Sequence, residues 1–533
     1  MSTSTFVLPD IATMSLEQKV AQLIHVDVPG LALDPETFAH LDEHDFHGVI
    51  LFAHNVRDRE QVVKLVDEIH DALAIVPFVS IDQEGGLVDR VRFPEMSLSP
   101  GLMALGATDD PVRVEAAHRI MGRELADLGV HIDFAPCLDV NVNPHNPIIG
   151  ARSLGENPER VGELGRAAIR GLRQGGVAAC AKHFPGHGDT SMDSHMALPT
   201  VAHPRERLEQ VELAPFRAAV AENVEAMMTA HIVFPAYDSL PATLSKTILT
   251  DLLRRDMGYQ GVIVTDSLSM KAIADHYGMG EATVRSVEAG ADLVLALGPI
   301  ADQKAAFQAL LEAARSGRVS EGRLDESLER LFALKRRFHN RPNLKPGFDQ
   351  AAHAREMREI AAAGVTVVRN EGLLPLRPGK VLVLTPDLLP VTPLGEMATS
   401  TSLATFMRSH EGEVVDQKFH FSGISGPAHH EVVARAAEAD TVVLALYARN
   451  RLSDPQRELA EAVLAANPRT VLVSLSSPYL LLDLPQAQAC VLGYNYTPLT
   501  LEAVAEVLLG KRQATGRLPV ALPGLYPAGH RAV

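Results

Sequence analysis

Ionisable side chains close several apolar segments in the N-terminal half of this chain. The residues concerned are Asp82, Asp139, Lys182 with His183, and His231. An aspartate ahead of a helix often accepts hydrogen bonds from the free backbone N–H groups of the first turn, so helix capping is the structural alternative to a chemical role. In a barrel of parallel strands the chemistry gathers at the C-terminal strand ends, and these side chains would meet there.

Asp266 is the clearest of these carboxylates. It directly follows the apolar run GVIVT, and Ser267 and Ser269 stand beside it as alternative caps for the next helix. An inward-pointing carboxylate that is not needed as a cap has no evident structural task. We therefore expect Asp266 to take part in chemistry.

The segment KHFPGHGDTSMDSHMALP, residues 182–199, mixes histidines and aspartates with glycine and proline. Loops this rich in titratable groups rarely serve packing alone. A metal site is one interpretation, because imidazole and carboxylate are ordinary metal ligands. However, the chain has no H-E-x-x-H motif, and His183, His187 and Asp189 fall in glycine-containing loop rather than on one helical face. The metal interpretation is therefore the weaker one.

The second interpretation of this segment is a dyad formed by Asp193 and His195. A carboxylate bonded to one ring nitrogen fixes the imidazole tautomer, and a histidine exchanges protons near neutral pH. Retaining glycosidases normally use two carboxylates, one as nucleophile and one as acid and base. In this chain His195 would replace the second carboxylate.

These side chains need a scaffold, and residues 1–338 alternate β-rich apolar runs with amphipathic helical patterns. The expected strands are residues 21–28, 48–53, 78–82, 131–140, 177–184, 226–234, 261–267 and 291–297. Runs that are apolar throughout suit parallel strands buried on both faces, and eight such units match an N-terminal (β/α)8 TIM-like barrel. A doubly wound open sheet is the alternative, which is disfavoured because no G-x-G-x-x-G opens a helix after an early strand.

A second domain is expected after the barrel. Residues 339–351 are rich in proline, glycine and polar residues and are typical of a linker. In residues 352–533, apolar runs such as KVLVLTPD and DTVVLALYA alternate with helical patterns. This alternation predicts a smaller α/β layered sandwich domain.

Composition narrows the possible partners and the compartment. A formal net charge of −17 argues against nucleic acid, whose phosphates require clustered Lys and Arg. The three cysteines, Cys137, Cys180 and Cys490, are far apart and odd in number, which favours a reducing compartment over a disulfide framework. No leader pattern opens the sequence, and no apolar run reaches the roughly 18 residues of a membrane span. These features predict a cytoplasmic protein without membrane association.

The chain resembles the β-N-acetylglucosaminidases of glycoside hydrolase family 3. The blocks SLEQKVAQL, IDQEGGLVDRV, ARSLGENPERV, KHFPGHGDTSMDSH, TAHIVFPA and GVIVTDSLSM occur in that family's order across the barrel. VTVVRNEGLLPL and TGRLPVALP resemble the family's C-terminal layered domain, so the likeness covers nearly the whole chain. The KHFPGHGDTSMDSH block is the most specific, because it separates this branch from the β-glucosidases.

The resemblance implies a role for each candidate residue. Asp266 would be the nucleophile that forms a covalent glycosyl intermediate, and His195 with Asp193 would be the acid and base. The residues that would hold the terminal sugar are Asp82, Arg90, Arg152, Lys182 and His183. Neither a metal nor a cofactor is expected. The chain has no Trp and only 5% aromatic residues, which favours a pocket for one terminal N-acetylglucosamine over a polysaccharide track. Small muropeptides from cell-wall turnover are the substrates that this suggests.

Two other activities remain open at this stage. A histidine acid/base leaves no second negative charge beside the intermediate, so phosphate could be the acceptor and the enzyme a phosphorylase. A β-glucosidase would instead take a carboxylate acid/base from the second domain. The candidates there are Glu411, Glu413 and Glu458, whose polar surroundings are typical of surface charges.

Overall fold

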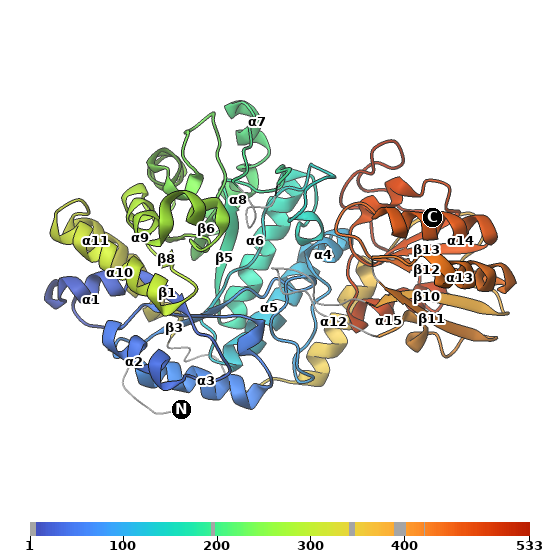
Figure 1. The fold of residues 1–533 in the computed structure, drawn as a ribbon, viewed down its shortest axis with the longest axis horizontal. Coiled ribbons are helices and arrows are strands. Elements are labelled where there is room, and N and C mark those ends of the chain that lie inside the picture. Colours follow the sequence, from blue (N-terminus) through green and yellow to red (C-terminus); the bar gives the residue numbers. More distant parts are fainter. Residues whose placement is uncertain (1–6, 193–197, 340–346, 388–400, 421, 533) are drawn as a thin grey trace.

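The computed structural model describes residues 7–192, 198–339, 347–387, 401–420 and 422–532. It contains one eight-stranded and one six-stranded sheet, which lie side by side along the longest axis of the molecule (Figure 1). The first sheet is built from the N-terminal part of the chain and the second from the C-terminal part. An α/β fold with a barrel followed by a smaller layered unit, as predicted from the sequence, is confirmed.

The first sheet is a parallel barrel. Its strands are β1 (Ile24–Asp27), β2 (Gly48–Leu51), β3 (Phe78–Ile81), β4 (Ile132–Asp133), β5 (Ala178–Phe184), β6 (Ala226–Thr229), β7 (Val262–Val264) and β8 (Val294–Leu295). They pair in the order β7-β6-β5-β4-β3-β2-β1-β8, and a parallel bridge between Val264 and Leu293 joins the two ends. The ring is therefore closed, which excludes the open doubly wound alternative. All eight strands fall within the predicted segments, because apolar runs mark strands that are buried on both faces.

Most strands end earlier than predicted, and the difference is largest at β4 and β6. β4 ends at Asp133, so Asp139 lies six residues beyond the strand, and β6 ends at Thr229, ahead of His231. Both segments stay apolar and buried after the strand ends, and the hydropathy pattern alone gives no stop signal.

Helices connect the strands around the barrel. They are α1 (Leu16–Ala21), α2 (Pro35–His44), α3 (Arg59–Ala72), α4 (Leu102–Thr108), α5 (Pro111–Asp127), α6 (Pro158–Gly175), α7 (Arg205–Gln210), α8 (Ala214–Ala221), η5 (Thr247–Asp256), α9 (Lys271–Ala289), α10 (Ile300–Arg315) and α11 (Glu321–Phe338). Several begin with a side-chain cap followed by proline in the first turn; α6, capped by Asn157 ahead of Pro158, is an example.

The second sheet is mixed. Its strands are β9 (Thr366–Asn370), β10 (Val381–Asp387), β11 (Val414–His420), β12 (Thr441–Leu446), β13 (Thr470–Ser474) and β14 (Ala489–Leu492), and β9 alone pairs antiparallel. Its helices are α12 (Gln350–Gly364), α13 (Gly426–Glu438), α14 (Asp454–Ala466) and α15 (Pro498–Leu508). The sequence missed β11, because this edge strand is largely exposed and lacks an apolar run.

The two sheets have separate cores that meet at the barrel wall. The core of the second sheet takes in five buried residues of the N-terminal part: Leu87, Met103, Ala104, Ala107 and Ala151. α11 ends at Phe338 and α12 begins at Gln350. The domain boundaries at residues 338 and 352 stay a prediction, because the core of the second sheet also includes residues of the barrel.

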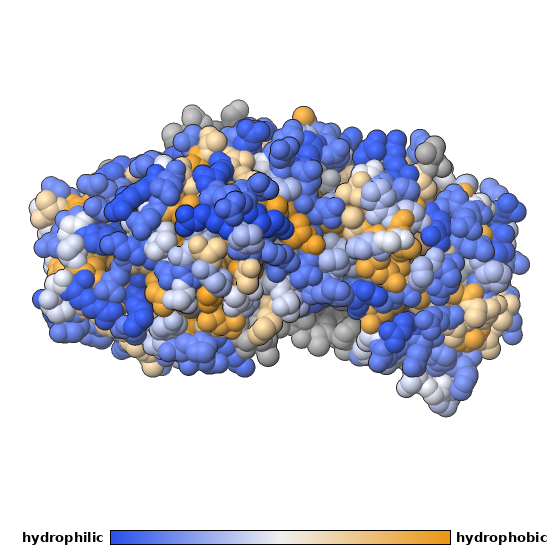
Figure 2. Space-filling model, turned by 90° about the horizontal axis from the view of Figure 1, so that it is seen from above, coloured by the Kyte–Doolittle hydropathy of each residue, from blue (hydrophilic) through white to orange (hydrophobic). Residues whose placement is uncertain are grey.

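Among the described residues, no helix has both the length and the apolar character that a bilayer crossing requires. On the face shown in Figure 2, hydrophilic residues predominate and hydrophobic ones form small separate groups.

Candidate active site

A cavity of about 270 Å³ opens at the C-terminal ends of the barrel strands. The described residues that line it come from β1 through β8 and the loops after them, between Asp27 and Gly298. Six predicted site residues lie in this lining: Asp82, Arg90, Arg152, Lys182, His183 and Asp266. Residues separated by up to 184 positions in the sequence thus face one space, as expected for a barrel. Asp193 and His195 lie outside the described residues.

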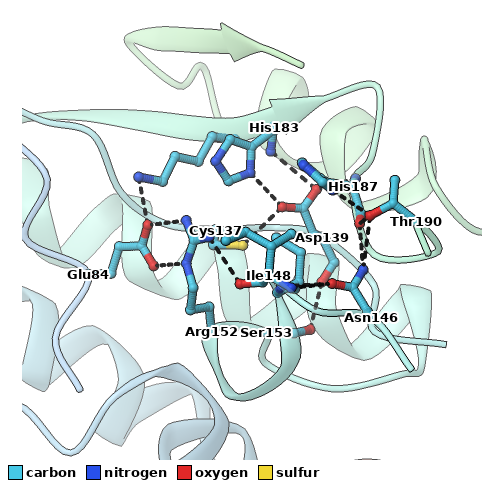
Figure 3. Close-up of polar contacts among 12 residues, drawn as sticks. Glu84, Cys137, Asp139, Asn146, Ile148, Arg152, Ser153, His183, His187 and Thr190 are labelled. Carbon is cyan, nitrogen blue, oxygen red and sulfur yellow. Dashed lines mark hydrogen bonds and ion pairs between the residues drawn. The ribbon is translucent and has the colours of Figure 1, made fainter. Parts of the chain in front are cut away.

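The floor of the cavity carries a network of buried ion pairs (Figure 3). The Lys182 ammonium lies 2.8 Å from Asp82 and 2.7 Å from Glu84. Arg152 donates to both oxygens of Glu84, from Nη2 at 2.7 Å and from Nε at 2.9 Å. This parallel arrangement is the strongest geometry for a guanidinium and a carboxylate. Glu84, which sequence reasoning did not single out, therefore fixes two of the predicted sugar-binding cations.

The charges in this network are held in place by their partners. Burial raises the pKa of the Glu84 carboxyl, but the positive charges of Arg152 and Lys182 outweigh that effect and hold the pKa well below its usual range. For Lys182, burial lowers the pKa, and the carboxylates of Asp82 and Glu84 outweigh it and raise the pKa above its usual value. Glu84 and Lys182 are therefore both ionised at neutral pH. Charged donors and acceptors already fixed in a cavity suit the hydroxyl groups of a sugar.

His183 is oriented by Asp139, a fully buried carboxylate (Figure 3). Asp139 Oδ2 accepts from His183 Nδ1 at 2.7 Å, and Oδ1 accepts from the backbone N–H of His187 at 2.6 Å. Burial raises the pKa of Asp139, but the neighbouring imidazole of His183 outweighs it and brings the pKa to about 2. With Nδ1 donating to a carboxylate, Nε2 is the ring nitrogen that His183 offers to the cavity.

Cys137 joins this cluster and gives it the composition of a metal site. Cys137, Asp139 and His183 are the one group of at least three His, Cys, Asp or Glu within the described residues whose ligand atoms lie close enough for a shared ion. Burial raises the pKa of the Cys137 thiol well above its usual value, so the thiol stays protonated and donates to Asp139 at 3.1 Å. Both Asp139 oxygens are already hydrogen-bond acceptors. The donor set fits a hydrogen-bond network rather than a metal.

The competing metal interpretation of residues 182–199 is not supported by the neighbours of its described members. The His187 ring bonds to Thr190 Oγ1 through Nδ1 at 2.8 Å. Asp189 pairs with His203 at 2.6 Å. The side chains of His183, His187 and Asp189 therefore each have a different partner, and these three do not form a group of close ligand atoms among the described residues.

Asp266 is held at the end of β7 without capping a helix. Its Oδ1 accepts from the backbone N–H of Ser267 at 2.7 Å. α9 begins at Lys271 after Met270, with no side-chain cap, so neither serine caps it either, contrary to expectation. His231 Nε2 bonds to the Ser267 carbonyl at 2.9 Å. His231 is thus a support for the Asp266 segment, whereas the sequence had placed it among the strand-end candidates.

The second sheet contributes none of the described lining residues. Glu411, Glu413 and Glu458 are all exposed. A carboxylate acid/base from these three positions is therefore not available to the described part of the cavity.

Glu84 and Asp139 are the site residues whose roles sequence reasoning missed. Glu84 stands within IDQEGG, a block that had been noted only for Asp82, and Asp139 had been noted as ionisable without a partner. Both contact residues from other parts of the barrel: Arg152 is 68 positions from Glu84, and His183 is 44 positions from Asp139. Pairing over such distances follows from the fold and has no local signal.

Comparison with known proteins agrees with this geometry. Residues 15–334 match the N-terminal domain of glycosyl hydrolase family 3, and residues 365–525 match its C-terminal domain. Beta-hexosaminidase A of Pseudoalteromonas piscicida is 32% identical over 547 residues, which cover 92% of this chain and 91% of that protein. A beta-N-acetylglucosaminidase/beta-glucosidase of Cellulomonas fimi is 29% identical and covers 97% of this chain and 95% of its own length.

A solved structure extends the likeness to three dimensions. The glycoside hydrolase family 3 beta-N-acetylglucosaminidase of Paenibacillus sp. str. FPU-7 superposes with a TM-score of 0.90 at 39% identity, over 96% of this chain and 99% of that one. The predicted family is confirmed: this chain belongs to glycosyl hydrolase family 3.

Proposed function

We propose that this enzyme is an exo-acting, retaining β-N-acetylglucosaminidase. The observation that carries the proposal is the meeting of Asp266, the ion-paired Lys182 and the Asp139-bound His183 in one cavity. The relatives described above bear hexosaminidase and N-acetylglucosaminidase names. A volume of about 270 Å³ suits one terminal sugar rather than a run of sugars.

In the proposed mechanism, the Asp266 carboxylate attacks the anomeric carbon as the bond from this carbon to the glycosidic oxygen breaks. Protonated His195 gives its proton to that oxygen, so the aglycone leaves as an alcohol. The positive charge that develops near the anomeric carbon is stabilised by ionised Asp266. Water then attacks the glycosyl ester after His195 removes its proton, and the second displacement restores the β configuration. Asp193 would orient His195. Because Asp193 and His195 lie outside the described residues, their roles come from the family resemblance.

We propose that the sugar is held by the charged and polar side chains that line the cavity. Asp82 accepts from sugar hydroxyls, Lys182 and Arg152 donate to them, and His183 engages one through Nε2. Arg90 lies with its guanidinium 5.9 Å from the centre of the Phe52 ring, which also lines the cavity. Fixed, paired polar groups discriminate strongly against sugars that lack a matching hydroxyl.

The acid/base assignment is tested on 4-nitrophenyl N-acetyl-β-glucosaminide. Asp193→Ala and His195→Ala should each lower kcat/KM by roughly a hundredfold or more, because general acid–base catalysis contributes about that much. Asp189→Asn is the matched control, since this aspartate of the same segment pairs with His203 and does not line the cavity. A double variant Asp193→Ala/His195→Ala with full activity would contradict the assignment.

The acceptor is tested in the same assay with and without phosphate. Hydrolysis gives free N-acetylglucosamine under both conditions, whereas a phosphorylase gives the sugar 1-phosphate when phosphate is present. Formation of the 1-phosphate as main product would replace hydrolysis by phosphorolysis.

We further propose that the natural substrates are small N-acetylglucosamine-containing glycosides, such as muropeptides from cell-wall turnover, acted on in the cytoplasm. All three cysteines are buried free thiols, which suits a reducing compartment. Release of N-acetylglucosamine from purified muropeptides, followed by mass spectrometry, tests the substrate. Fractionation of the native host's cells tests the compartment.

A further inference from the structure

The loops that carry the buried charges of the cavity rest on the second sheet. Leu87 and Ala151 belong to the hydrophobic core of that sheet, and each stands close in sequence to a member of the ion-pair network, Glu84 and Arg152 respectively. The second sheet adds no described residue to the lining of the cavity, yet its core packs against the loops that carry Glu84 and Arg152. Any influence of the second sheet on the cavity must therefore pass through the contacts between its core and these loops.

One polar contact crosses this boundary close to the His183 support. Tyr479 lies in the short helix η7 (Pro478–Asp483) and is 1% exposed. Its hydroxyl accepts from Asn141 Nδ2 at 2.9 Å and lies 3.4 Å from the Asn141 carbonyl oxygen, to which it donates. Asn141 is itself fully buried. The hydroxyl thus engages both the side chain and the backbone of one barrel residue.

From Asn141 the constraint reaches Asp139. The backbone N–H of Asn141 donates to the Gly155 carbonyl at 2.9 Å. Ser153 Oγ bonds to the carbonyls of Asp139 at 2.6 Å and of Gly155 at 2.9 Å. Residues 139–141 and 153–155 are therefore tied together, and Ser153 directly follows Arg152 (Figure 3). A shift of Asn141 would therefore move Asp139, whose carboxylate orients His183. It would also move Ser153, the neighbour of Arg152, which holds Glu84.

We propose that Tyr479 of the C-terminal domain is a positioning residue for the active site. Its hydroxyl fixes Asn141, and through the 139–141 segment it sets the place of Asp139 and the orientation of His183. This inference rests on the proposed function, in that His183 is taken to bind the sugar. It gives the C-terminal domain a part in substrate binding without any contact to substrate.

The chain offers a matched pair of variants. Tyr479→Phe removes the hydroxyl that reaches the barrel. Tyr494→Phe is the control, because Tyr494 is equally buried at 2% exposure, and its hydroxyl donates to Thr366 Oγ1 at 3.0 Å within the second sheet. A purely structural role would lower the melting temperature of both variants alike.

Binding and turnover are the readouts, measured at 25 °C, well below unfolding. Tyr479→Phe is expected to raise the inhibition constant of N-acetylglucosamine and to lower kcat/KM by roughly fivefold, because small misplacements of a binding group cost rate. Tyr494→Phe is expected to match the wild type in both. Asn141→Ala should reproduce the Tyr479→Phe effect, and the double variant should add little to either, since both remove the same contact.

The outcomes separate the two proposals. If the wild type hydrolyses the N-acetylglucosaminide and Tyr479→Phe equals Tyr494→Phe in the inhibition constant and kcat/KM, the positioning role is overturned while the proposed function stands. If the wild type fails to act on or bind N-acetylglucosaminides, the proposed function has failed. Crystal structures of the two variants then decide the positioning role without substrate: a changed contact between Asp139 and His183 in Tyr479→Phe alone supports it, and an unchanged contact overturns it.

Discussion

The two ends of the barrel each bury a lysine, and the surroundings of the two lysines differ. At the C-terminal end, Lys182 contacts the carboxylates of Asp82 and Glu84. At the N-terminal end, Lys335 donates to three neutral oxygens, of Gln22, His47 and Val76.

The pKa values follow these neighbours. Carboxylates overcome the cost of burial at Lys182 and raise its pKa. At Lys335, burial dominates and lowers the pKa to about 7, with Asp45 opposing it only in part. Lys182 thus keeps its charge beside two carboxylates, whereas Lys335 is held by hydrogen bonds to backbone and amide oxygens.

The largest expected effect is that of removing Glu84, the carboxylate that Arg152 and Lys182 share at the C-terminal end of the barrel. Glu84→Gln should destabilise the protein by about 3–5 kcal/mol, because it removes the charged partner of buried Arg152 and one of the two carboxylates that contact buried Lys182. It should also lower kcat/KM by roughly a hundredfold, since Arg152 and Lys182 lose their fixed positions. Urea unfolding and steady-state kinetics measure the two effects.

The control for Glu84→Gln lies at the opposite end. Glu225 stands just ahead of β6, is 1% exposed, and pairs with Arg173 at 2.6 Å and Arg337 at 3.2 Å. Glu225→Gln should destabilise the protein by less, because the side chains of Arg173 and Arg337 are 24% and 51% exposed and stay solvated without it. It should leave kcat/KM unchanged. Equal loss of activity in both variants would mean that the two ends do not differ in function.

Next in size is the loss of the His183 support. Asp139→Asn should lower kcat/KM by roughly tenfold to a hundredfold, because a neutral amide holds the imidazole less firmly than a carboxylate. Asp292→Asn is the matched variant: Asp292 is fully buried ahead of β8 and pairs with Arg254 at 2.6 Å. It should lose stability without losing activity. Kinetics of folded Asp139→Asn indistinguishable from the wild type would remove Asp139 from the account.

A smaller effect is expected from pH at the N-terminal end. The pKa of Lys335 is about 7 in the folded protein, below its usual value of 10.5. Between these values the unfolded chain binds more protons, so the stability contributed by this group rises with pH. From pH 7 to pH 9 the wild type should gain about 2 kcal/mol that Lys335→Met does not gain, as judged by urea unfolding.

Lys19 provides the reference for that experiment. It is 2% exposed, but it pairs with Glu321 and Asp325, both at 2.7 Å. Burial lowers the pKa of Lys19, but hydrogen bonds to Asp325 and Glu321 outweigh it and raise the pKa. Lys19→Met should therefore keep the wild-type gain between pH 7 and pH 9. The same gain in Lys335→Met would show that Lys335 does not titrate in this range.

The smallest effect is expected from the exposed glutamates of the C-terminal sheet. Glu413→Gln and Glu458→Gln should leave kcat/KM within error of the wild type, because neither lines the cavity. A loss of a hundredfold in either would move the acid/base to the second domain and make the enzyme resemble the β-glucosidase branch.

The barrel could be predicted from sequence because its strands are apolar on both faces, as in GVILFA and GVIVTDS, and the strand ends then identify most of the pocket. β11 could not, since an exposed edge strand such as Val414–His420 has no apolar signature. Glu84 and Arg152 lie in the segments after β3 and β4, and Asp139 and His183 lie after β4 and in β5, so only the closed ring brings the partners together. Tyr479 lies 338 residues from Asn141 and gives no local sign of its contact.

The proposed mechanism requires that Asp266 forms the covalent bond to the sugar. A slowly hydrolysed fluorinated N-acetylglucosaminide should label the enzyme once, and peptide mapping by mass spectrometry should place the sugar on Asp266. A label on another residue, or turnover without any glycosyl-enzyme under conditions that trap one, would contradict the account.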